Sequence, residues 1–415
     1  MLDIKFIREN PELVKQGCKK KHVEVDIDKL LKLDKKSREF LKKIEGLRHR
    51  INVISAKKPT STKIKEARII KQELKKLETR LQKARDKFND LMLRVPIPPA
   101  ADVPEGKSED DNVPVKFLGE PPKFDFPPKD YITLMEDLDL LDLERGAKVG
   151  GFRQYIIKNE AVLIEQALLR WTLDCLIKKR FTLFRPTVMV KEFAMIGTGM
   201  FPGGEKEAYR VGDGLFLSGT TEVPLMAYYA DEILDEKDLP IKMVGISIAF
   251  RKEVGSYGKD VKGILRVHEF WQTEQVIICK NDEKESIKWH EELLKNSEEF
   301  MQALELPYRV VNCCGGDLAG GQVKRYDIEA WVPSQGKYRE THSDSYLFDF
   351  QTRRLNIRYR AKEGRARFAH SLNQTAIAVP RILIPIIENY QQKDGSVKIP
   401  KVLQKYLDFE VVKKK

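Results

Sequence analysis

Residues 247–275 read SIAFRKEVGSYGKDVKGILRVHEFWQTEQ. Apolar and β-branched residues dominate both ends, whereas glycines and lysines fill the middle, which predicts two adjacent strands joined by a basic loop through Gly255, Gly258 and Gly263. Because side chains alternate faces along a strand, several charged and aromatic groups would project from one surface of the sheet. These groups are Arg251, Glu253, Arg266 and Phe270.

Such a surface suits a nucleotide. Arginine offers forked donors for phosphate oxygens, an aromatic ring offers a face for a base, and a carboxylate accepts a hydrogen bond from an exocyclic amine. A charged hairpin on an antiparallel sheet would give the same local pattern. The residues of this stretch alone leave both interpretations open.

The run FRKEVGSYGKDVKGILRVHEF resembles motif 2 of the class II aminoacyl-tRNA synthetases, in the form found in the seryl-tRNA synthetases. The resemblance extends from MLDIKFIRENPELV at the start to ENYQQKDGSVKIPKVLQKYL near the end. It implies an α+β fold in which an antiparallel helical coiled-coil arm precedes a catalytic domain built on an antiparallel sheet flanked by helices. The implied activity is ATP-dependent conversion of L-serine to seryl-adenylate, followed by transfer of the seryl group to the terminal ribose of tRNA(Ser).

The composition is that of a charge-rich globular protein. The 415 residues are 41% hydrophobic and 33% charged, enough for two domains. We find no run of about 18 apolar residues and no apolar signal core at the start, so we expect a cytoplasmic protein without a membrane span. The five cysteines lack metal or disulfide spacing, which favours reduced thiols.

The positive charge is concentrated in one segment. Residues 28–94 contain 22 Lys and Arg against 9 Asp and Glu, a net charge of +13, whereas the whole chain carries +12. The rest of the chain is therefore close to neutral. A local basic excess of this kind indicates a nucleic-acid-binding arm.

The same segment has two heptad runs. Apolar residues recur at alternating spacings of three and four from Leu30 to Ile54 and again from Ala67 to Val95, with a break at Pro59. This predicts two antiparallel helices with one narrow apolar seam. We expect an N-terminal domain at 1–99 with its arm at about 28–95, a proline-rich linker at 100–114 and a catalytic domain at 115–415.

The arm has three possible uses. A dimerisation coiled coil and a solvated spacer would both show heptads, but the basic excess favours contact with RNA phosphates. The resemblance implies a tRNA-binding arm that approaches the long variable region of tRNA(Ser). Whether tRNA(Sec) is a second substrate stays open.

The body of the chain mixes helices and strands. Residues 161–176 predict an amphipathic helix, and the following strand at 181–184 stops at Pro186. By resemblance this is motif 1, which packs across the two-fold axis of a homodimer. We also expect a helix over 286–304 and strands around Cys279, Val310, Ile328 and Leu355.

The resemblance also implies an ATP site. Arg251 would hold the α-phosphate and the attacking carboxylate, Glu253 the adenine amine, and Phe270 one face of the base. Arg381 would begin a helix and hold the γ-phosphate, so Arg251 and Arg381 are the expected catalytic residues. The full expected set is Arg251, Lys252, Glu253, Arg266, Val267, Phe270, Glu340, Thr341, His342, Ser343 and Arg381. Taken alone, Arg381 would favour an ion pair on a helix surface; the intact motif 2 favours the phosphate role instead.

Magnesium would accompany ATP. By resemblance, Glu340 and Ser343 occupy the positions that hold a divalent cation against the phosphates. Carboxylate and hydroxyl oxygens are ligands that Mg²⁺ accepts.

A serine pocket must bind an ammonium group and a small hydroxyl group. Buried carboxylates and hydroxyls suit this task, because a site built to hydrogen-bond a hydroxyl rejects an analogue that lacks it. Glu274 has a second interpretation, as a strand-edge carboxylate paired with a lysine. The expected serine-binding residues, by resemblance, are Thr220, Thr221, Glu222, Arg251, Glu274, Asn373 and Thr375.

Three strings depart from the usual family pattern. Gly219-Thr220-Thr221-Glu222 stands where Pro-Thr-Ala-Glu is usual, and 341–344 reads Thr-His-Ser-Asp in place of Ser-Ser-Cys-Ser. By resemblance, motif 3 is the run from Asn373 to Arg381; in it Gln374 and Ala376 replace glycines and Pro380 precedes the arginine.

Alternative functions remain on the sequence alone. They are a non-catalytic synthetase-like RNA-binding paralogue, a class II ligase for another small amino acid such as threonine or alanine, and a basic coiled-coil scaffold. Retention of Arg251, Glu253, Glu340 and Arg381 together argues against loss of catalysis.

Overall fold

The computed structural model describes residues 1–56, 60–254, 260 and 262–414. The chain folds into two compact units, Met1–Pro98 and Pro99–Lys415. Three residues that the sequence places in a turn and in a glycine loop lie outside the described residues: Pro59, Gly255 and Gly258.

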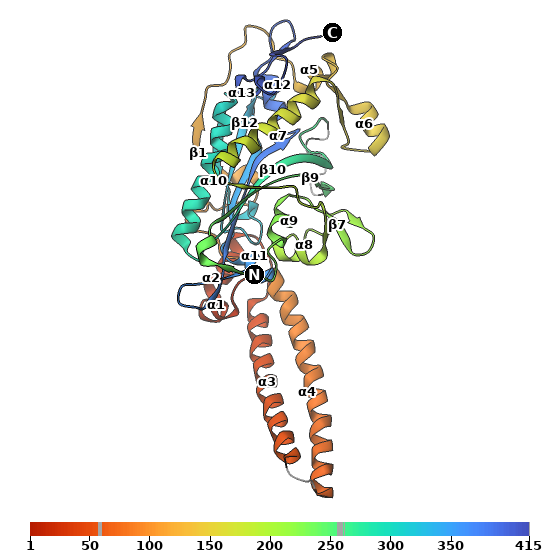
Figure 1. Ribbon diagram of the computed structural model, residues 1–415, viewed down its shortest axis with the longest axis vertical. Coiled ribbons are helices and arrows are strands. Elements are labelled where there is room, and N and C mark those ends of the chain that lie inside the picture. Colours follow the sequence, from red (N-terminus) through yellow and green to blue (C-terminus); the bar gives the residue numbers. More distant parts are fainter. Residues whose placement is uncertain (57–59, 255–259, 261, 415) are drawn as a thin grey trace. The chain divides into compact units, whose positions relative to one another are not determined.

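The first unit is helical. Its helices are α1 (Ile4–Glu9), α2 (Pro11–Lys20), α3 (Ile27–Ser55) and α4 (Ser61–Arg94). The last two run side by side as a long antiparallel pair (Figure 1). The side chain of Asp26 caps α3 by accepting a hydrogen bond from the Lys29 amide at 2.8 Å.

The seam between α3 and α4 is the predicted apolar stripe. Its buried residues are Ile44, Leu47, Ile70, Leu77 and Leu81. Exposed ion pairs flank the seam, with Arg48 and Glu78 at 2.8 Å and Arg50 and Glu66 at 2.9 Å. Exposed pairs of this kind contribute little, so burial of the seam holds the two helices together. The heptad prediction of an antiparallel helical hairpin is confirmed.

The second unit is built on an eight-stranded sheet with the order β1-β11-β12-β13-β16-β10-β9-β4. All neighbouring strands are antiparallel except β4 and β9, which are parallel. The strands are β1 (Val113–Leu118), β4 (Thr182–Phe184), β9 (Ile241–Phe250), β10 (Glu269–Cys279), β11 (Tyr308–Asn312), β12 (Lys324–Val332), β13 (Lys337–Tyr346) and β16 (His370–Val379). The predicted α+β class with a largely antiparallel sheet is confirmed.

Two long helices, α7 (Glu160–Lys178) and α10 (Glu283–Ala303), cover one face of this sheet (Figure 1). Trp171 of α7 and Phe300 of α10 meet edge to face, with ring centroids 5.4 Å apart. On the other face, the residues 222–227 pack against β9 and β10, and a further part of that face borders a cavity. The remaining helices are α5 (Tyr131–Asp137), α6 (Leu143–Gly150), α8 (Glu192–Thr198), α9 (Glu222–Ala227), α11 (Phe350–Arg354), α12 (Leu383–Asn389) and α13 (Lys401–Gln404).

Four small sheets complete the unit. Their strands are β2 (Leu141–Asp142) with β3 (Ile156–Ile157), β5 (Met189–Lys191) with β7 (Leu215–Leu217) and β6 (Arg210–Val211), β15 (Ala366–Phe368) with β14 (Arg358–Arg360) and β8 (Ile233–Asp235), and β17 (Val397–Lys398) with β18 (Val411–Val412). The segment 100–112 packs on the main sheet, since Val103 is buried and the Ala100 amide donates to the Val323 carbonyl at 2.9 Å.

Three local expectations are wrong. The strand expected around Leu355 is instead the end of α11, because the residues 350–354 form a helical turn packed beside α8. The strand expected to contain Arg266 starts only at Glu269. Arg381 does not begin a helix, since α12 starts at Leu383.

All five cysteines lie in the described residues and carry free thiols, and Cys313 and Cys314 are buried. No helix among the described residues has the length and apolar character needed to cross a lipid bilayer.

Candidate active site

A cavity of about 360 Å³ opens on the sheet face opposite α7 and α10. It receives side chains from strands β10, β12, β13 and β16 and from the segments that flank them. Ten of the residues predicted for the site line it: Arg251, Glu253, Arg266, Val267, Phe270, Glu340, Thr341, Ser343, Thr375 and Arg381. Three stretches that are distant in sequence therefore meet in one place.

Arg251 and Phe270 face each other at the ends of β9 and β10. The guanidinium carbon of Arg251 lies 5.2 Å from the Phe270 ring centroid, and its Nε donates to the Gly219 carbonyl at 2.9 Å. Because Arg251 follows the last residue of β9, its backbone turns away from the strand while its amide still bonds to the His268 carbonyl at 2.9 Å. Both side chains are thus fixed before any ligand binds.

Glu340 lies among arginines. Burial alone would raise the pKa of its carboxyl group, but Arg381, Arg325, Arg251 and Arg266 together lower that pKa below its ordinary value. The Arg381 Nη1 atom is 3.2 Å from the Glu340 Oε1 atom. Glu340 is therefore a carboxylate at neutral pH.

Arg266 is held by acids on several sides. Its guanidinium lies 3.2 Å from Asp260, 3.7 Å from Glu253 and 3.8 Å from Glu109. Asp260 also contacts Arg339 at 2.5 Å. Burial lowers the pKa of Arg266, but these carboxylates raise it overall, so the side chain stays charged.

Gly263 sets the path of the segment that carries Arg266. Its φ is +87°, and a Cβ atom there would meet the Tyr131 hydroxyl oxygen at 1.7 Å. That hydroxyl oxygen accepts a hydrogen bond from the Ile264 amide at 3.0 Å. Only glycine fits both the conformation and the contact.

Two β-bulges shape the cavity floor. On β13 an extra residue lies at Thr341, between the pairs Ile328 with His342 and Glu329 with Glu340. On β16 an extra residue lies at Ala376. Each bulge shifts the alternation of side chains, so that residues on both sides of it face the cavity.

His342 joins these two bulges. One ring nitrogen lies 2.8 Å from the Thr341 hydroxyl oxygen and the other lies 2.9 Å from the Ala376 carbonyl oxygen. Burial lowers the pKa of His342 to about 4, so the ring is neutral. His342, predicted to contact ATP, does not line the cavity but sits within the sheet beneath it.

Five of the seven predicted serine-binding residues form a largely buried layer beside the cavity: Thr220, Thr221, Glu222, Glu274 and Asn373. Thr220, Thr221, Glu222 and Glu274 are each less than 8% exposed. Asn373 lies on β16 opposite Ser345, and Lys252 points its ammonium group at the Tyr209 ring at 5.3 Å. These six do not line the cavity, whereas Thr375 does.

The two acids of this layer carry raised pKa values. Burial raises the pKa of Glu222 to about 7, although Gln351 donates to it at 2.6 Å and Arg251 is nearby. Burial, together with the negative charge of Glu222, raises the pKa of Glu274 well above its ordinary range. A positively charged group entering beside them would favour the ionised forms of both acids.

Several lining residues were not predicted. They are Glu109, Asn112, Gln272, Asp317, Arg325, Asp327 and Glu329, with apolar neighbours. Three of them alternate along β12, which is the period expected for one strand face, so the string RYDIE contained the necessary pattern.

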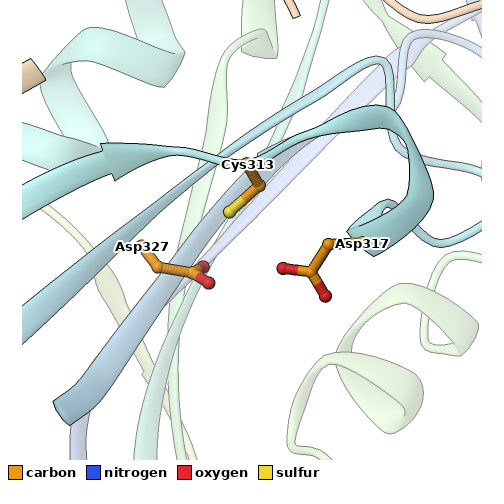
Figure 2. Close-up of side chains that lie close together, drawn as sticks. All are labelled: Cys313, Asp317 and Asp327. Carbon is orange, nitrogen blue, oxygen red and sulfur yellow. The ribbon is translucent and has the colours of Figure 1, made fainter. Parts of the chain in front are cut away.

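Cys313, Asp317 and Asp327 form a compact cluster, with one potential ligand atom from each lying within 4.8 Å of the others (Figure 2). Arg325 already supplies a cation there. Its Nε donates to the Cys313 sulfur at 3.2 Å, and its Nη2 contacts Asp327 at 3.0 Å and also Asp317. A guanidinium with these contacts occupies the position a metal ion would need, so the cluster reads as an ion-pair network.

Comparison with known proteins identifies the architecture. Residues 1–98 match the model of the seryl-tRNA synthetase N-terminal domain, and residues 207–390 match that of the tRNA synthetase class II core domain (G, H, P, S and T). A serine–tRNA ligase of Deinococcus radiodurans is 45% identical over 98% of this chain and 97% of its own. One from Pyrococcus horikoshii is 43% identical over 99% and 97% of the two chains.

Solved structures agree. The seryl-tRNA synthetase of Pyrococcus horikoshii in complex with ATP superposes with a TM-score of 0.93 at 42% identity, covering 99% of both chains. The cytoplasmic serine–tRNA ligase of Naegleria fowleri in complex with AMP gives 0.90 at 33% identity, covering 100% of this chain and 99% of that chain.

The raised pKa of Glu222 predicts a pH dependence of stability. The folded state keeps a proton on Glu222 up to about pH 7, whereas the unfolded chain releases it near 4.5, so stability falls as pH rises through this window. In Glu222→Gln this loss is absent. We expect the variant to gain about 1–3 kcal/mol relative to the unsubstituted protein between pH 5 and 8, measured by urea unfolding.

The control for this prediction is Glu144→Gln on exposed α6, which should show no pH-dependent difference from the unsubstituted protein. A difference between Glu222→Gln and the unsubstituted protein that stays constant from pH 5 to 8 would contradict a buried, protonated Glu222.

Proposed function

The chain belongs to the seryl-tRNA synthetase family, and we propose that it is a serine–tRNA ligase, a class II aminoacyl-tRNA synthetase that forms seryl-adenylate and then seryl-tRNA(Ser). One observation carries this proposal: Arg251, Glu340 and Arg381 line a single cavity over the sheet. The two guanidinium groups suit the phosphates of ATP, and the Glu340 carboxylate suits a cation bound with them.

The first step joins two anions. The carboxylate oxygen of serine attacks the α-phosphorus of ATP, and pyrophosphate leaves with the bonding electrons. Arg251, fixed by Gly219 and Phe270, would neutralise charge on the α-phosphoryl group as it develops. Arg266 and Arg381 would hold the β- and γ-phosphates, so positioning and charge stabilisation supply the rate without a protein nucleophile.

The second step transfers the acyl group. A hydroxyl group of the terminal tRNA ribose attacks the carbonyl carbon of seryl-adenylate, and AMP leaves. Serine would enter the buried layer beside the cavity, where Glu222 and Glu274 would accept hydrogen bonds from its ammonium group. Thr220, Asn373 and Thr375 would form hydrogen bonds with its hydroxyl and carboxyl oxygens.

The residues present fit Mg²⁺. The lowered pKa of Glu340 keeps it ionised, and the Ser343 hydroxyl faces the same cavity, so both are oxygen ligands that the ion accepts. When bound with ATP, Mg²⁺ would neutralise phosphate charge. Glu340 also pairs with Arg381 and so holds the Arg381 guanidinium where it would face the phosphates.

The first unit would bind tRNA. The arm between Asp28 and Arg94 carries the basic excess of the chain, which suits phosphate contacts to tRNA(Ser). We propose a tRNA-binding domain at 1–99 with its arm at about 28–95, a linker at 100–114 and a catalytic domain at 115–415; the division into the units Met1–Pro98 and Pro99–Lys415 supports this proposal. A tRNA(Sec) with the same long variable region would present similar phosphates to the arm.

A homodimer is supported by apolar side chains left exposed on motif 1. Leu163 and Ile177 on α7 are 48% and 47% exposed and lie 14 residues apart, about four turns along one helix face. Leu183 on the edge strand β4 is 47% exposed. An exposed apolar set beside an unpaired strand edge suits a second copy of the chain.

The direct test of the proposed function is serine-dependent exchange between ATP and pyrophosphate. We expect exchange with serine and Mg²⁺, none without either, and a loss of about 10³-fold in Arg251→Ala because a charge-stabilising donor is removed. Arg145→Ala, an exposed arginine paired with Asp142, is the matched control and should exchange normally.

Two results would overturn the proposal. Folded protein without any exchange would favour the non-catalytic paralogue. A higher specificity constant for threonine or alanine than for serine would assign the fold to another amino acid.

A second prediction separates the arm from the chemistry. Deleting residues 28–94 should leave the exchange rate within about twofold, because every cavity residue lies in the second unit, and should abolish charging of tRNA(Ser). The rival scaffold function predicts that exchange is lost as well. Filter assays of charging and exchange on the same preparation distinguish the two.

A third prediction concerns the dimer. Leu163→Lys or Leu183→Lys would place a charge in the apolar contact and should weaken dimerisation by at least about tenfold, measured by light scattering across a dilution series. Val149→Lys, at an 82% exposed position on α6, is the control. An unchanged molar mass in all three variants would place the interface elsewhere.

A further inference from the structure

We infer that Gln272 is a positioning residue for the amino-acid site, one that sets serine affinity through the hydroxyl groups of Thr220 and Thr221. The inference rests on the proposed function and deepens it. Gln272 lies on β10 between Phe270 and Glu274, and it lines the cavity although only 2% of it is exposed.

The contacts of the Gln272 side chain are specific. Its Nε2 donates to the Thr221 hydroxyl oxygen at 2.9 Å and to the Thr220 hydroxyl oxygen at 3.2 Å. The Thr221 hydroxyl lies 2.7 Å from that of Ser247, which is the cross-strand partner of Gln272 on β9. One amide group therefore ties the segment 218–222 to two neighbouring strands.

The backbone of this segment gives the contacts their importance. The Ser218 carbonyl accepts from the Phe250 amide at 2.9 Å, and the Gly219 carbonyl accepts from Arg251. The segment then passes directly into α9, whose first residue is Glu222. A shift at Thr220 would therefore move the buried carboxylate proposed to accept from the serine ammonium group.

The Thr221 side chain packs closely against the backbone of β9. A Cβ atom on Gly245, the cross-strand partner of Glu274, would meet the Thr221 Cγ2 atom at 2.5 Å. The Thr221 methyl group therefore fills the space that Gly245 leaves, while its hydroxyl reaches Gln272. Thr221 stands where the family string has alanine, so this hydroxyl link belongs to this chain rather than to the string.

The hydrogen-bond roles fix the Thr220 hydroxyl. Its oxygen already accepts from Gln272 and from the Glu222 amide at 3.2 Å. With both acceptor positions used, its proton is left to be donated, which suits an oxygen atom of the amino acid or of Glu274. Removing Gln272 would free this hydroxyl to rotate.

The test is steady-state exchange kinetics on Gln272→Met, which keeps the length of the side chain and removes the donor. We expect KM for serine to rise about tenfold while KM for ATP stays within twofold. Gln272→Glu also lacks the donor and adds a third carboxylate beside Glu222 and Glu274, so its serine KM should rise further.

Gln275→Met is the matched control. Gln275 is on the same strand, is fully buried, and faces α10, where it bonds to Asn296 and Ser297. Its variant should lose thermal stability comparably without a selective change in serine KM. If both variants shift the two KM values alike, Gln272 is only a structural residue and the inference fails.

A double-mutant cycle with Thr221→Val tests the path. If Gln272 acts through the threonine hydroxyls, the combined rise in serine KM will be well below the product of the single rises. A combined rise equal to the product of the single rises overturns the inference. An unchanged serine KM in Thr221→Val also overturns it. If Gln272→Met does not fold, the Thr221→Val result alone decides. Absence of serine exchange in the unsubstituted protein would instead reject the proposed function.

Discussion

The mutual neutralisation of arginines and carboxylates over one sheet face is the constraint on which the site depends. Burial lowers the pKa of Arg251, and repulsion between Arg251 and Arg381 lowers it further. Glu340 lies 3.2 Å from Arg381 and attracts both arginines, so its negative charge offsets their repulsion. Among the described residues the cavity is lined by four arginines and six carboxylates, so each cation of the site is held in place by acidic neighbours before a polyphosphate binds.

The two β-bulges of the sheet bring these side chains to one cavity, which a regular sheet would not do. Strict alternation would send half of each strand toward α10 and away from the cavity. The extra residues at Thr341 and Ala376 change the alternation beside the site, and the neutral ring of His342 bonds to both bulges at once. Burial lowers the pKa of His342, so the neutral ring bridges the Thr341 hydroxyl and the Ala376 carbonyl without placing a charge in the cavity floor.

Much of this was predictable from sequence, and the exceptions have physical causes. Heptads predicted the arm because one seam dominates its burial, and period two predicted β9 and β10. Periodicity could not reveal that Arg266 precedes its strand, because Gly263 and Tyr131 fix that path through a contact between distant residues. The bulge that turns His342 inward is equally invisible to local pattern, since it depends on register between strands. The cavity-lining residues of β12 could have been predicted, because the charged residues of the string RYDIE alternate and so lie on one strand face.

The face of the sheet on which a residue lies decides whether its departure from the family string affects the site. Gln374 is fully buried, and its cross-strand partners Gln275 and Asp344 contact α10 residues, so it lies behind the sheet, away from the cavity. Ala376 sits in a bulge whose carbonyl, not its side chain, is used. Replacing glycine at these two positions therefore alters packing behind the site. Thr221 differs in kind, because its hydroxyl bonds to Gln272 on the cavity side. Departures from the family pattern in the 218–222 segment therefore alter hydrogen bonds beside the proposed serine site, whereas those at positions 374 and 376 do not.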